Sequence, residues 1–230
     1  MSMTPRARAR EETMSRIVEL GRKQLDAGGP EALNLRAIAR DLGIVSSGIY
    51  RYVPDRAHLL TMLIIDAFEA LDGAVAQGVG TATGARAKFV SLVAAMRMWA
   101  LKFPQRWALI YGTPIIGYEA PASETTGAGT KVSRRLAVLL SETSVKELEP
   151  RSSQLSQDLA TASDELDVEL PADVMEKALE AWIQIIGVIN AEVFGYLGKD
   201  TLNDYHEFHA RMVSRLCLLY TSDAADERSS

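Results

Sequence analysis

Cysteine and long apolar runs are almost absent from this chain, and both absences exclude whole classes of protein. The only cysteine among the 230 residues is Cys217, so neither an internal disulfide nor a cysteine-based zinc site is expected. The best apolar run, Leu59 to Ile65, ends at Asp66 and is far too short for a secretory signal or a membrane span. We therefore expect a cytoplasmic protein that has no membrane partner.

Features of enzymes are equally scarce. The chain has three histidines, no glycine-rich phosphate loop, no Gly-x-Ser-x-Gly motif and no paired cysteines. His206 and His209 have a helical spacing that suits a metal ion, but the sequence offers no third ligand that we can place beside them. We expect no catalytic residue, no metal site and no cofactor.

Patterns that predict β-strands are also hard to find. Aromatic residues make up 7% of the chain, and alternating runs rich in Val, Ile and Thr are rare, whereas Ala and Leu are abundant. A hydrophobic content of 47% is enough for one or two cores. The sequence therefore predicts an all-α protein.

The charge of the chain is unevenly distributed. The formal net charge is −5, yet residues 1–60 hold ten Lys and Arg against seven Asp and Glu, whereas the remainder holds fifteen against twenty-three. A basic N-terminal module on an acidic body suits a protein that contacts phosphates with one face only. Chance asymmetry remains open as an alternative.

The N-terminal region has the pattern of a helix-turn-helix. Apolar spacing predicts helices over residues 11–27, 35–41, about 46–53 and 56–77, with Asn34 and Asp55 as caps and Gly43 as the sharp turn. Two short helices around such a turn, supported by a preceding helix, place the second helix in the major groove of DNA. We expect double-stranded operator DNA as a partner.

The second short helix offers side chains suited to that groove. Ser46 and Ser47 are small and polar, so they allow close approach, while Tyr50, Arg51 and Tyr52 can reach phosphate oxygens. The alternatives are that the two tyrosines are packing residues and that the two serines are plain caps.

At these residues the chain resembles the DNA-binding domain of TetR-family repressors. The resemblance lies in LRAIARDLGI (Leu35 to Ile44) and GIYRYVPDRAHLL (Gly48 to Leu60). It implies that Tyr50, Tyr52 and Arg56 touch phosphates and that the start of the recognition helix reads bases. The full set of expected DNA-binding residues is Asn34, Val45, Ser46, Ser47, Tyr50, Arg51, Tyr52 and Arg56.

Two departures from the family pattern leave the helix register open by one residue. Val45 stands where members usually carry Ser, which moves the expected capping hydroxyl to Ser46, and Ala57-His58 replaces an acidic pair. Gly48 also costs about 1 kcal/mol of helix propensity relative to Ala.

The connecting helix 56–77 is expected to span roughly 30 Å, at about 1.5 Å per residue, and to act as a lever between the two regions. Further helices are expected after it. Their expected ranges are 86–101, 105–111, 131–148, 172–197 and about 201–216, with a turn-rich loop at 112–121 and a polar acidic segment with one short helix at 149–170. Met96, Trp99, Trp107, Tyr111 and Tyr118 crowd into the first part and suit an apolar ligand cavity, although they equally suit a helical core.

This second region resembles the ligand-binding C-terminal domain of a TetR subfamily. The resemblance lies in YGTP (111–114), GYEAP (117–121), WIQIIG (182–187) and EVFGYL (192–197). It implies that Trp182 and Ile186 join the ligand site and that the last two helices pair with their copies in a homodimer. The expected interface residues are Ile183, Gly187, Val193, Phe194 and Leu197, for which an intramolecular core role stays open.

The expected organisation is a DNA-binding domain at 1–58, a ligand-binding and dimerisation domain at 59–216, and a tail at 217–230. Residues 217–227, CLLYTSDAADE, resemble the translation of a transposase-type sequencing adapter, so we expect the tail to be non-native. The resemblance implies a one-component transcriptional repressor that a small apolar or aromatic effector releases from DNA. The alternative is a helical ligand-binding or adaptor protein whose DNA-binding element is weakened, as Val45 and Gly48 would suggest.

Overall fold

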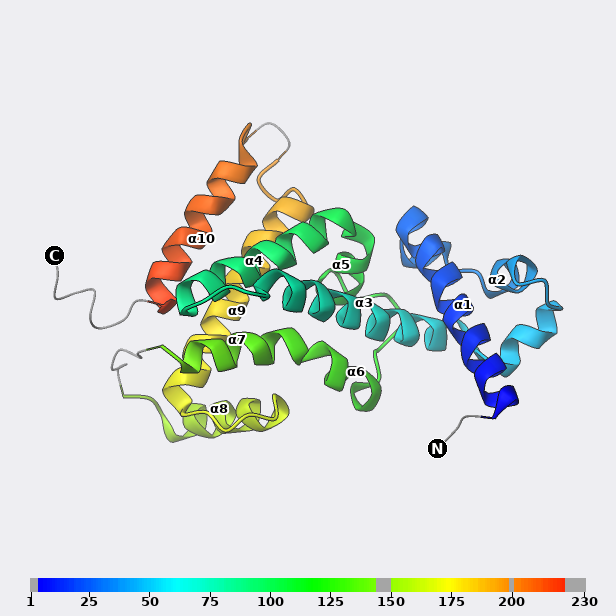
Figure 1. Ribbon diagram of the computed structural model, residues 1–230, viewed down its shortest axis with the longest axis horizontal. Helices are drawn as coiled ribbons and strands as arrows, with labels where there is room; N and C mark the ends of the chain where they lie inside the picture. Colours follow the sequence, from blue (N-terminus) through cyan, green and yellow to red (C-terminus); the bar gives the residue numbers. More distant parts are fainter. Residues whose placement is uncertain (1–3, 144–149, 199–200, 222–230) are drawn as a thin grey trace. The chain divides into compact units, whose positions relative to one another are not determined.

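The computed structural model describes residues 4–143, 150–198 and 201–221, and this part of the chain consists of helices and connections without a β-strand (Figure 1). The all-α prediction is confirmed. None of the helices in these ranges combines the length and apolarity needed to cross a membrane. The chain forms two compact units: the first comprises residues up to Glu69 with Phe103–Ala128, and the second comprises Ala70–Lys102 with the chain from Gly129 onward.

The first unit contains the helix-turn-helix and more. Its elements are α1 (Pro5–Gly28), η1 (Pro30–Ala32), α2 (Leu35–Asp41), η2 (Ser46–Arg51), the first part of α3 (Arg56–Val79), α5 (Pro104–Tyr111) and most of α6 (Ala122–Gly129). Leu109, Ile115 and Tyr118 pack against the same apolar core as the helix-turn-helix. The unit is therefore larger than the expected module 1–58, whose boundary as a functional domain stays a prediction.

Local signals explain where the N-terminal helices begin and end. The N–H of Ala7 donates to Thr4 Oγ1 over 3.3 Å and Pro5 opens α1, so the helix begins six residues before the expected Glu11. It ends at Gly29, whose φ of 69° is accessible to glycine at little cost. As expected, Asn34 caps α2 through a 3.1 Å bond from the N–H of Ala37, and Asp55 accepts a 2.8 Å bond from the N–H of His58.

The second short helix differs from its prediction. It is a 3₁₀ helix that ends at Arg51 rather than an α-helix to Val53, with bonds of the i to i+3 type from Gly48 N–H to Val45 and from Tyr52 N–H to Ile49. Its N-cap is Val45, and no side chain caps it, so the expected capping role of Ser46 is wrong. The preceding turn at Gly43 has the expected positive φ, 72°.

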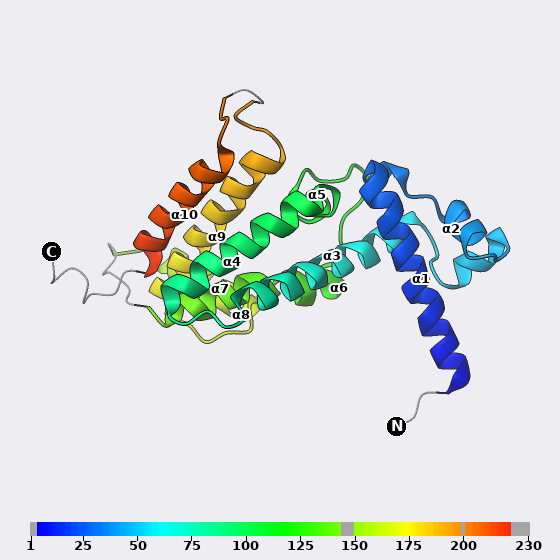
Figure 2. The same ribbon diagram turned by 45° about the horizontal axis from the view of Figure 1, so that its top comes forward.

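The second unit is built around α9 (Ala172–Val193). This helix packs against α4 (Ala85–Lys102), α7 (Lys131–Ser141), α8 (Ser153–Glu165) and α10 (Tyr205–Thr221), and α4 also contacts α7 and α10 (Figures 1 and 2). Its buried side includes Met175, Ala181, Ile185 and Ile189, spaced so that they fall on one stripe of the helix.

Several boundaries in this unit differ from expectation. The α6 helix lies where no helix was expected, α7 ends at Ser141 instead of residue 148, and α9 ends at Val193, shortly before Gly195 with its φ of 66°. The last part of the expected helix 131–148 lies outside the described residues. The α10 helix begins at Tyr205 and continues to Thr221, and it buries Cys217, Tyr220 and Thr221. Residues 217–221 therefore fold with the second unit, whatever their origin.

Candidate nucleic-acid interface

The core of the first unit fixes the two short helices of the helix-turn-helix. Ile38 and Ala39 of α2, Ile49 of η2 and Val53 just after it are completely buried in one apolar cluster. Leu35 and Gly48 are buried as well, so the exposed positions include Arg36 and Arg40 of α2 and the other residues of η2. The packing of these residues into the core therefore determines which side chains of α2 and η2 point outward.

That outer surface carries most of the expected DNA-binding residues. Ser46, Ser47 and Arg51 are exposed, Tyr50 is 45% exposed, and Val45 is 72% exposed. Hydroxyls can bond base edges or phosphates, and an exposed branched methyl group suits contact with a thymine methyl. All five residues are exposed within η2 or at its N-cap, and their contact with DNA stays a prediction.

Tyr50 in η2 and Tyr52, the C-cap residue of η2, lie in different surroundings. Tyr52 is half-buried, packs against the core, and lies under the guanidinium of Arg10, which is 5.3 Å from the ring centroid. Tyr50 has no such cover. The packing alternative therefore applies in part to Tyr52, whereas Tyr50 is placed as a surface residue.

Gly48, whose low helix propensity is unfavourable in a recognition helix, faces inward. A Cβ atom at this position would lie 3.5 Å from Val45 Cγ2 and 3.7 Å from an Arg51 guanidinium nitrogen, which are ordinary van der Waals distances. The glycine is therefore required neither by a close approach nor by a positive φ.

Arg56 has partners within the first unit. Its guanidinium donates to the carbonyl of Pro30 over 2.8 Å and lies 3.4 Å from the carboxylate of Glu31. Arg56 therefore links the start of α3 to η1. Its expected phosphate contact stays a prediction.

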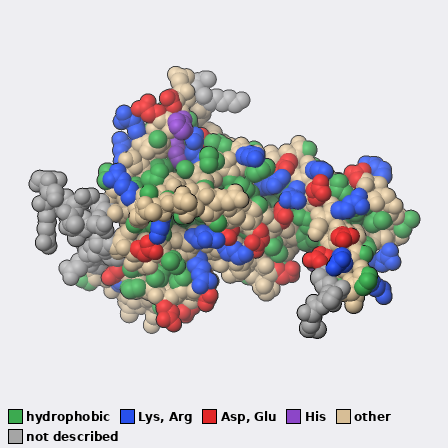
Figure 3. Space-filling model, in the orientation of Figure 1, with side chains coloured by type: hydrophobic (Ala, Val, Ile, Leu, Met, Phe, Trp, Pro, Cys, Tyr) green, Lys and Arg blue, Asp and Glu red, His purple; other side chains and the backbone are tan. Residues whose placement is uncertain are grey.

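Sequence reasoning missed two arginines beside the expected site. Arg36 and Arg40 line a surface groove of about 550 Å³ together with Asn34, Val45 and Ser46. Their spacing of four residues, opposite the buried face of α2, was the signal that could have found them. Figure 3 shows Lys and Arg side chains on the surface around α2 and η2.

The expected ligand-binding residues separate into two groups. In the first unit, the ring of Trp107 lies 4.6 Å from that of Tyr111, and Phe68 packs edge-on against Tyr111 at 5.8 Å. Burial raises the pKa of the Tyr111 hydroxyl. The Tyr118 hydroxyl bonds Thr61 Oγ1 over 2.8 Å. These aromatic residues pack into the unit that contains the helix-turn-helix.

The other group lies in the second unit. Met96 and Trp99 belong to α4, and Trp182 and Ile186 belong to α9, which packs against α4. Met96 is fully buried and Trp99 almost so, whereas Trp182 and Ile186 are half-buried. A ligand would have to open the core to reach the first two. The assignment of the seven residues to a ligand site stays a prediction.

A cavity of about 320 Å³ lies between α4 and α10. It is lined by His206, His209 and Arg97. His209 is buried, and in the described part of the chain its Nε2 atom has no hydrogen-bond partner. Burial, reinforced by the Arg97 cation, lowers the pKa of His209 to about 4, so its imidazole is neutral at pH 7. Within the described residues, no group of three His, Cys, Asp or Glu could hold a metal ion.

The expected dimer residues lie at the exposed side of α9 and just beyond its end. Ile183 is 68% exposed and shares its face with Gly187 one turn later, while Leu197 is also exposed. Val193 and Phe194 are half-buried. On α10, Leu218 and Leu219 add exposed apolar surface.

Comparison with known proteins decides the family. The family model described as "Tetracyclin repressor-like, C-terminal domain" matches residues 89–216. The HTH-type transcriptional regulator Rv1816 of Mycobacterium tuberculosis is 38% identical over 203 residues, which cover 85% of this chain and 87% of that protein. The chain belongs to the TetR family of transcriptional regulators.

Solved structures agree with this assignment to the TetR family. The regulatory protein SCO4313 has 27% sequence identity and a TM-score of 0.74, over 93% of this chain and 98% of that one. RolR, solved with resorcinol, has 18% identity and a TM-score of 0.53, over 96% of this chain and 94% of that one, and it shares the fold. The TetR-family chain is thus a transcriptional regulator with a helix-turn-helix.

Proposed function

We propose that this TetR-family regulator is a repressor that binds operator DNA as a dimer through the outer face of α2 and η2. The observation that supports the proposal is the exposure of Ser46, Ser47 and Tyr50 on η2. Ser46 lines one surface groove with Arg36 and Arg40 of α2. The arginines neutralise phosphates and position the element, and the serines with Val45 face the bases. No catalytic role is part of the proposal.

A mobility-shift titration with DNA from the region upstream of its own gene, at two salt concentrations, tests the DNA-binding step. For Arg36→Ala and Arg40→Ala we expect weaker binding and a salt dependence (log K against log salt) that is less steep by about 0.9 for each phosphate that the variant no longer neutralises. Lys23→Ala is the control, since Lys23 lies on α1, paired with Glu19 at 2.7 Å, outside this groove. Absent or salt-independent binding by the unaltered protein would instead favour the helical ligand-binding or adaptor alternative.

Dimerisation through α9 and α10 is the second part of the proposal. The exposed Ile183, Gly187 and Leu197 supply apolar surface at the outer side of α9 and beyond its end that water disfavours. Sedimentation of Ile183→Asp is expected to give monomers at concentrations where the unaltered protein is dimeric. Ile116→Asp, at a loop position that is 99% exposed, is a matched control and should leave the assembly unchanged.

Release by a small effector is the third part, and the first unit offers a route for it. In this unit Arg106 of α5 donates two hydrogen bonds, of 2.8 and 2.5 Å, to Asp26 of α1. A displacement of α5 would therefore also displace α1, the helix that supports α2 and η2. The α3 helix runs from Arg56, next to η2 in sequence, into the second unit. A change in the spacing of two recognition helices, which must be about 34–36 Å apart, would then abolish binding.

Effector release can be tested by thermal-shift screening with apolar and aromatic metabolites, followed by the mobility-shift assay. RolR was solved with resorcinol, which makes phenols reasonable first probes. A compound that raises the melting temperature and lowers DNA affinity would support effector release. A compound that stabilises the protein and leaves its DNA affinity unchanged would contradict that part of the proposal.

A further inference from the structure

The first part of α1 extends beyond the core of its unit. Residues 4–12 are all exposed, and the first buried residue of the helix is Ile17. Helices in proteins derive most of their stability from the packing of an apolar face. Residues 4–12 bury no such face, although Thr4 caps the helix and Pro5 is a favourable first residue. This segment is therefore helical without contributing to the core.

Two arginines continue the core-facing stripe of α1 into this exposed segment. The buried side of the helix carries Ile17 and Gly21. At the α-helical spacing of about 100° per residue, Arg10 and Arg6 lie on that same side. Arg8 lies about 160° around the axis from Arg10, on the opposite side. The stripe that is apolar in the core is thus basic where it leaves the core.

Arg10 connects this basic stripe to the recognition element. Its two terminal guanidinium nitrogens each lie 3.5 Å from the carbonyl oxygen of Arg51, the last residue of η2. The guanidinium also lies 5.3 Å from the centroid of the Tyr52 ring. Arg6 precedes Arg10 by one turn, about 6 Å along the axis, and shares its side of the helix. Both arginines are therefore on the side of α1 that faces the end of η2.

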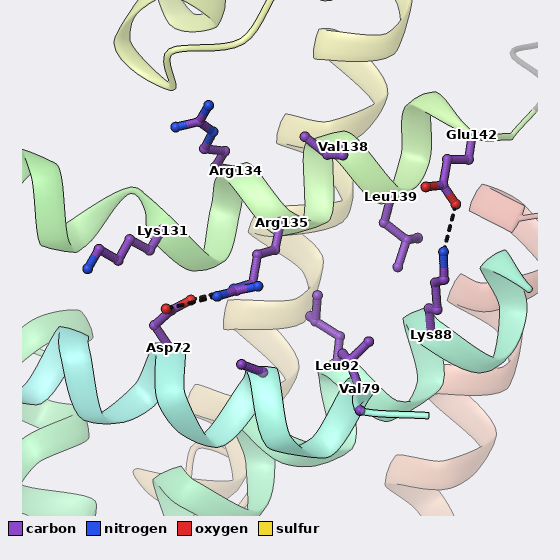
Figure 4. A pocket seen from close by; sticks show the side chains of 12 residues that line it. Asp72, Val79, Lys88, Leu92, Lys131, Arg134, Arg135, Val138, Leu139 and Glu142 are labelled. Atoms are coloured by element: carbon purple, nitrogen blue, oxygen red, sulfur yellow. Dashed lines mark hydrogen bonds and ion pairs between the residues drawn. The ribbon is translucent and has the colours of Figure 1, made fainter. Parts of the chain in front are cut away.

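Within the described residues, neither of these arginines pairs with a carboxylate. Arg6 forms no hydrogen bond or ion pair in this part of the chain, and Arg10 meets a neutral carbonyl group and an aromatic ring. Cations of the second unit differ, since Arg135 bonds Asp72 over 2.5 and 3.1 Å (Figure 4). Like charges one turn apart repel each other, and an anion bound beside both arginines would relieve that repulsion.

We propose that Arg6 and Arg10 bind backbone phosphates of the operator DNA beside the end of η2. The basic stripe is continuous with the recognition element, because Arg10 contacts the last residue of η2. Guanidinium groups bind phosphates with two parallel bonds, and Arg10 has five N–H donors, more than Arg51 occupies. The inference rests on the proposed function, DNA binding through α2 and η2, and it adds the first turns of α1 to the interface.

Salt titrations of DNA binding with Arg6→Ala and Arg8→Ala test the proposal. The two variants remove the same exposed charge from opposite sides of one helix, and alanine favours the helix in both. Arg6→Ala should weaken binding to the upstream DNA at least about threefold and make the salt dependence less steep by about 0.9 for each phosphate lost. Arg8→Ala should leave the salt dependence unchanged. Equal effects of the two variants would overturn the proposal, because general charge attraction would then explain both.

Ethylation interference identifies the phosphates themselves. At least one phosphate in each half-site should weaken binding of the unaltered protein when it is ethylated, and should have no such effect on Arg6→Ala. An identical interference pattern for both proteins would contradict the contact. Arg6→Ala should also weaken binding to an unrelated duplex by the same factor, because phosphate contacts carry no sequence information. A loss confined to the operator would overturn the assignment to phosphates.

Arg10 needs a second readout, because it also contacts the recognition element. Arg10→Ala should reduce the salt dependence as Arg6→Ala does, and it should lower the urea midpoint as well, since it loses the contacts with Arg51 and Tyr52. A lower urea midpoint with an unchanged salt dependence would restrict Arg10 to a structural role and overturn its part in phosphate binding.

The behaviour of Arg36→Ala separates this inference from the proposed function. If Arg36→Ala weakens DNA binding while Arg6→Ala behaves like Arg8→Ala, the proposed function stands and the role of α1 is wrong. If the unaltered protein shows no salt-dependent DNA binding, both are wrong.

Discussion

Arg97 and Glu192 form a buried ion pair whose disruption should be costly. Their side chains are 13% and 11% exposed, and the guanidinium meets the carboxylate through two bonds of 2.6 and 2.5 Å that connect α4 to the end of α9. Glu192→Gln keeps the shape but leaves the arginine charge without its counter-charge. Removal of one partner of a buried pair typically costs about 3–5 kcal/mol. Because some water reaches this pair, we expect about 2–4 kcal/mol.

Urea unfolding followed by circular dichroism would measure this cost. A decrease of about 3 kcal/mol is a large fraction of the roughly 5–15 kcal/mol that stabilises a typical domain. Arg97→Met combined with Glu192→Leu should be far less damaging, since it removes both charges from the interior. Glu207→Gln breaks the exposed pair with Arg211 and should cost less than about 1 kcal/mol. A Glu192→Gln variant that loses no more stability than Glu207→Gln, or a double variant as unstable as the single one, would refute a costly buried charge.

Three further outcomes are expected. Gly48→Ala should raise the free energy of unfolding by about 0.5–1 kcal/mol and preserve DNA binding, because its Cβ meets no close contact; a lower urea midpoint would contradict this. A chain that stops after Leu216 should be less stable than one that stops after Thr221 by about 3 kcal/mol, since it lacks the buried Cys217 and Tyr220; equal melting temperatures would show that residues 217–221 contribute nothing. Burial raises the pKa of Asp66, so the folded state holds this proton more tightly than the unfolded state, and stability falls as the pH rises from the ordinary aspartate pKa through the raised one. Asp66→Asn should remove that part of the fall in urea midpoints between pH 4 and 7, and an unchanged pH profile would refute the assignment.

The helix-turn-helix was predictable because its signals are local. Asn34, Gly43 and Asp55 each act on backbone groups within a few residues, and all three do in the structure what their types predict. The recognition element itself was harder to predict. Its backbone hydrogen bonds join residues three apart instead of four, and apolar spacing over six residues does not distinguish a 3₁₀ helix from an α-helix.

The ion pairs between helices of the second unit could not be predicted, because their charges come from distant parts of the chain. Asp72 and Arg135 lie on α3 and α7, and Arg97 and Glu192 lie on α4 and α9; these side chains meet only through packing of the second unit. Likewise, the proximity of Trp99 and Trp107 in the sequence suggested one aromatic cavity, whereas the structure assigns them to different units.

Arg56 illustrates how a structural contact and an expected functional contact can coexist. The guanidinium uses one N–H group for the carbonyl of Pro30, and its second neighbour, Glu31, has an 86% exposed side chain. An arginine carries five N–H donors, so the bond to Pro30 leaves several for a phosphate. A phosphate needs to displace only the exposed carboxylate, which is a weak partner in water. The intramolecular bond therefore fixes the direction of the side chain, and a side chain already held in place loses less conformational entropy when it binds DNA.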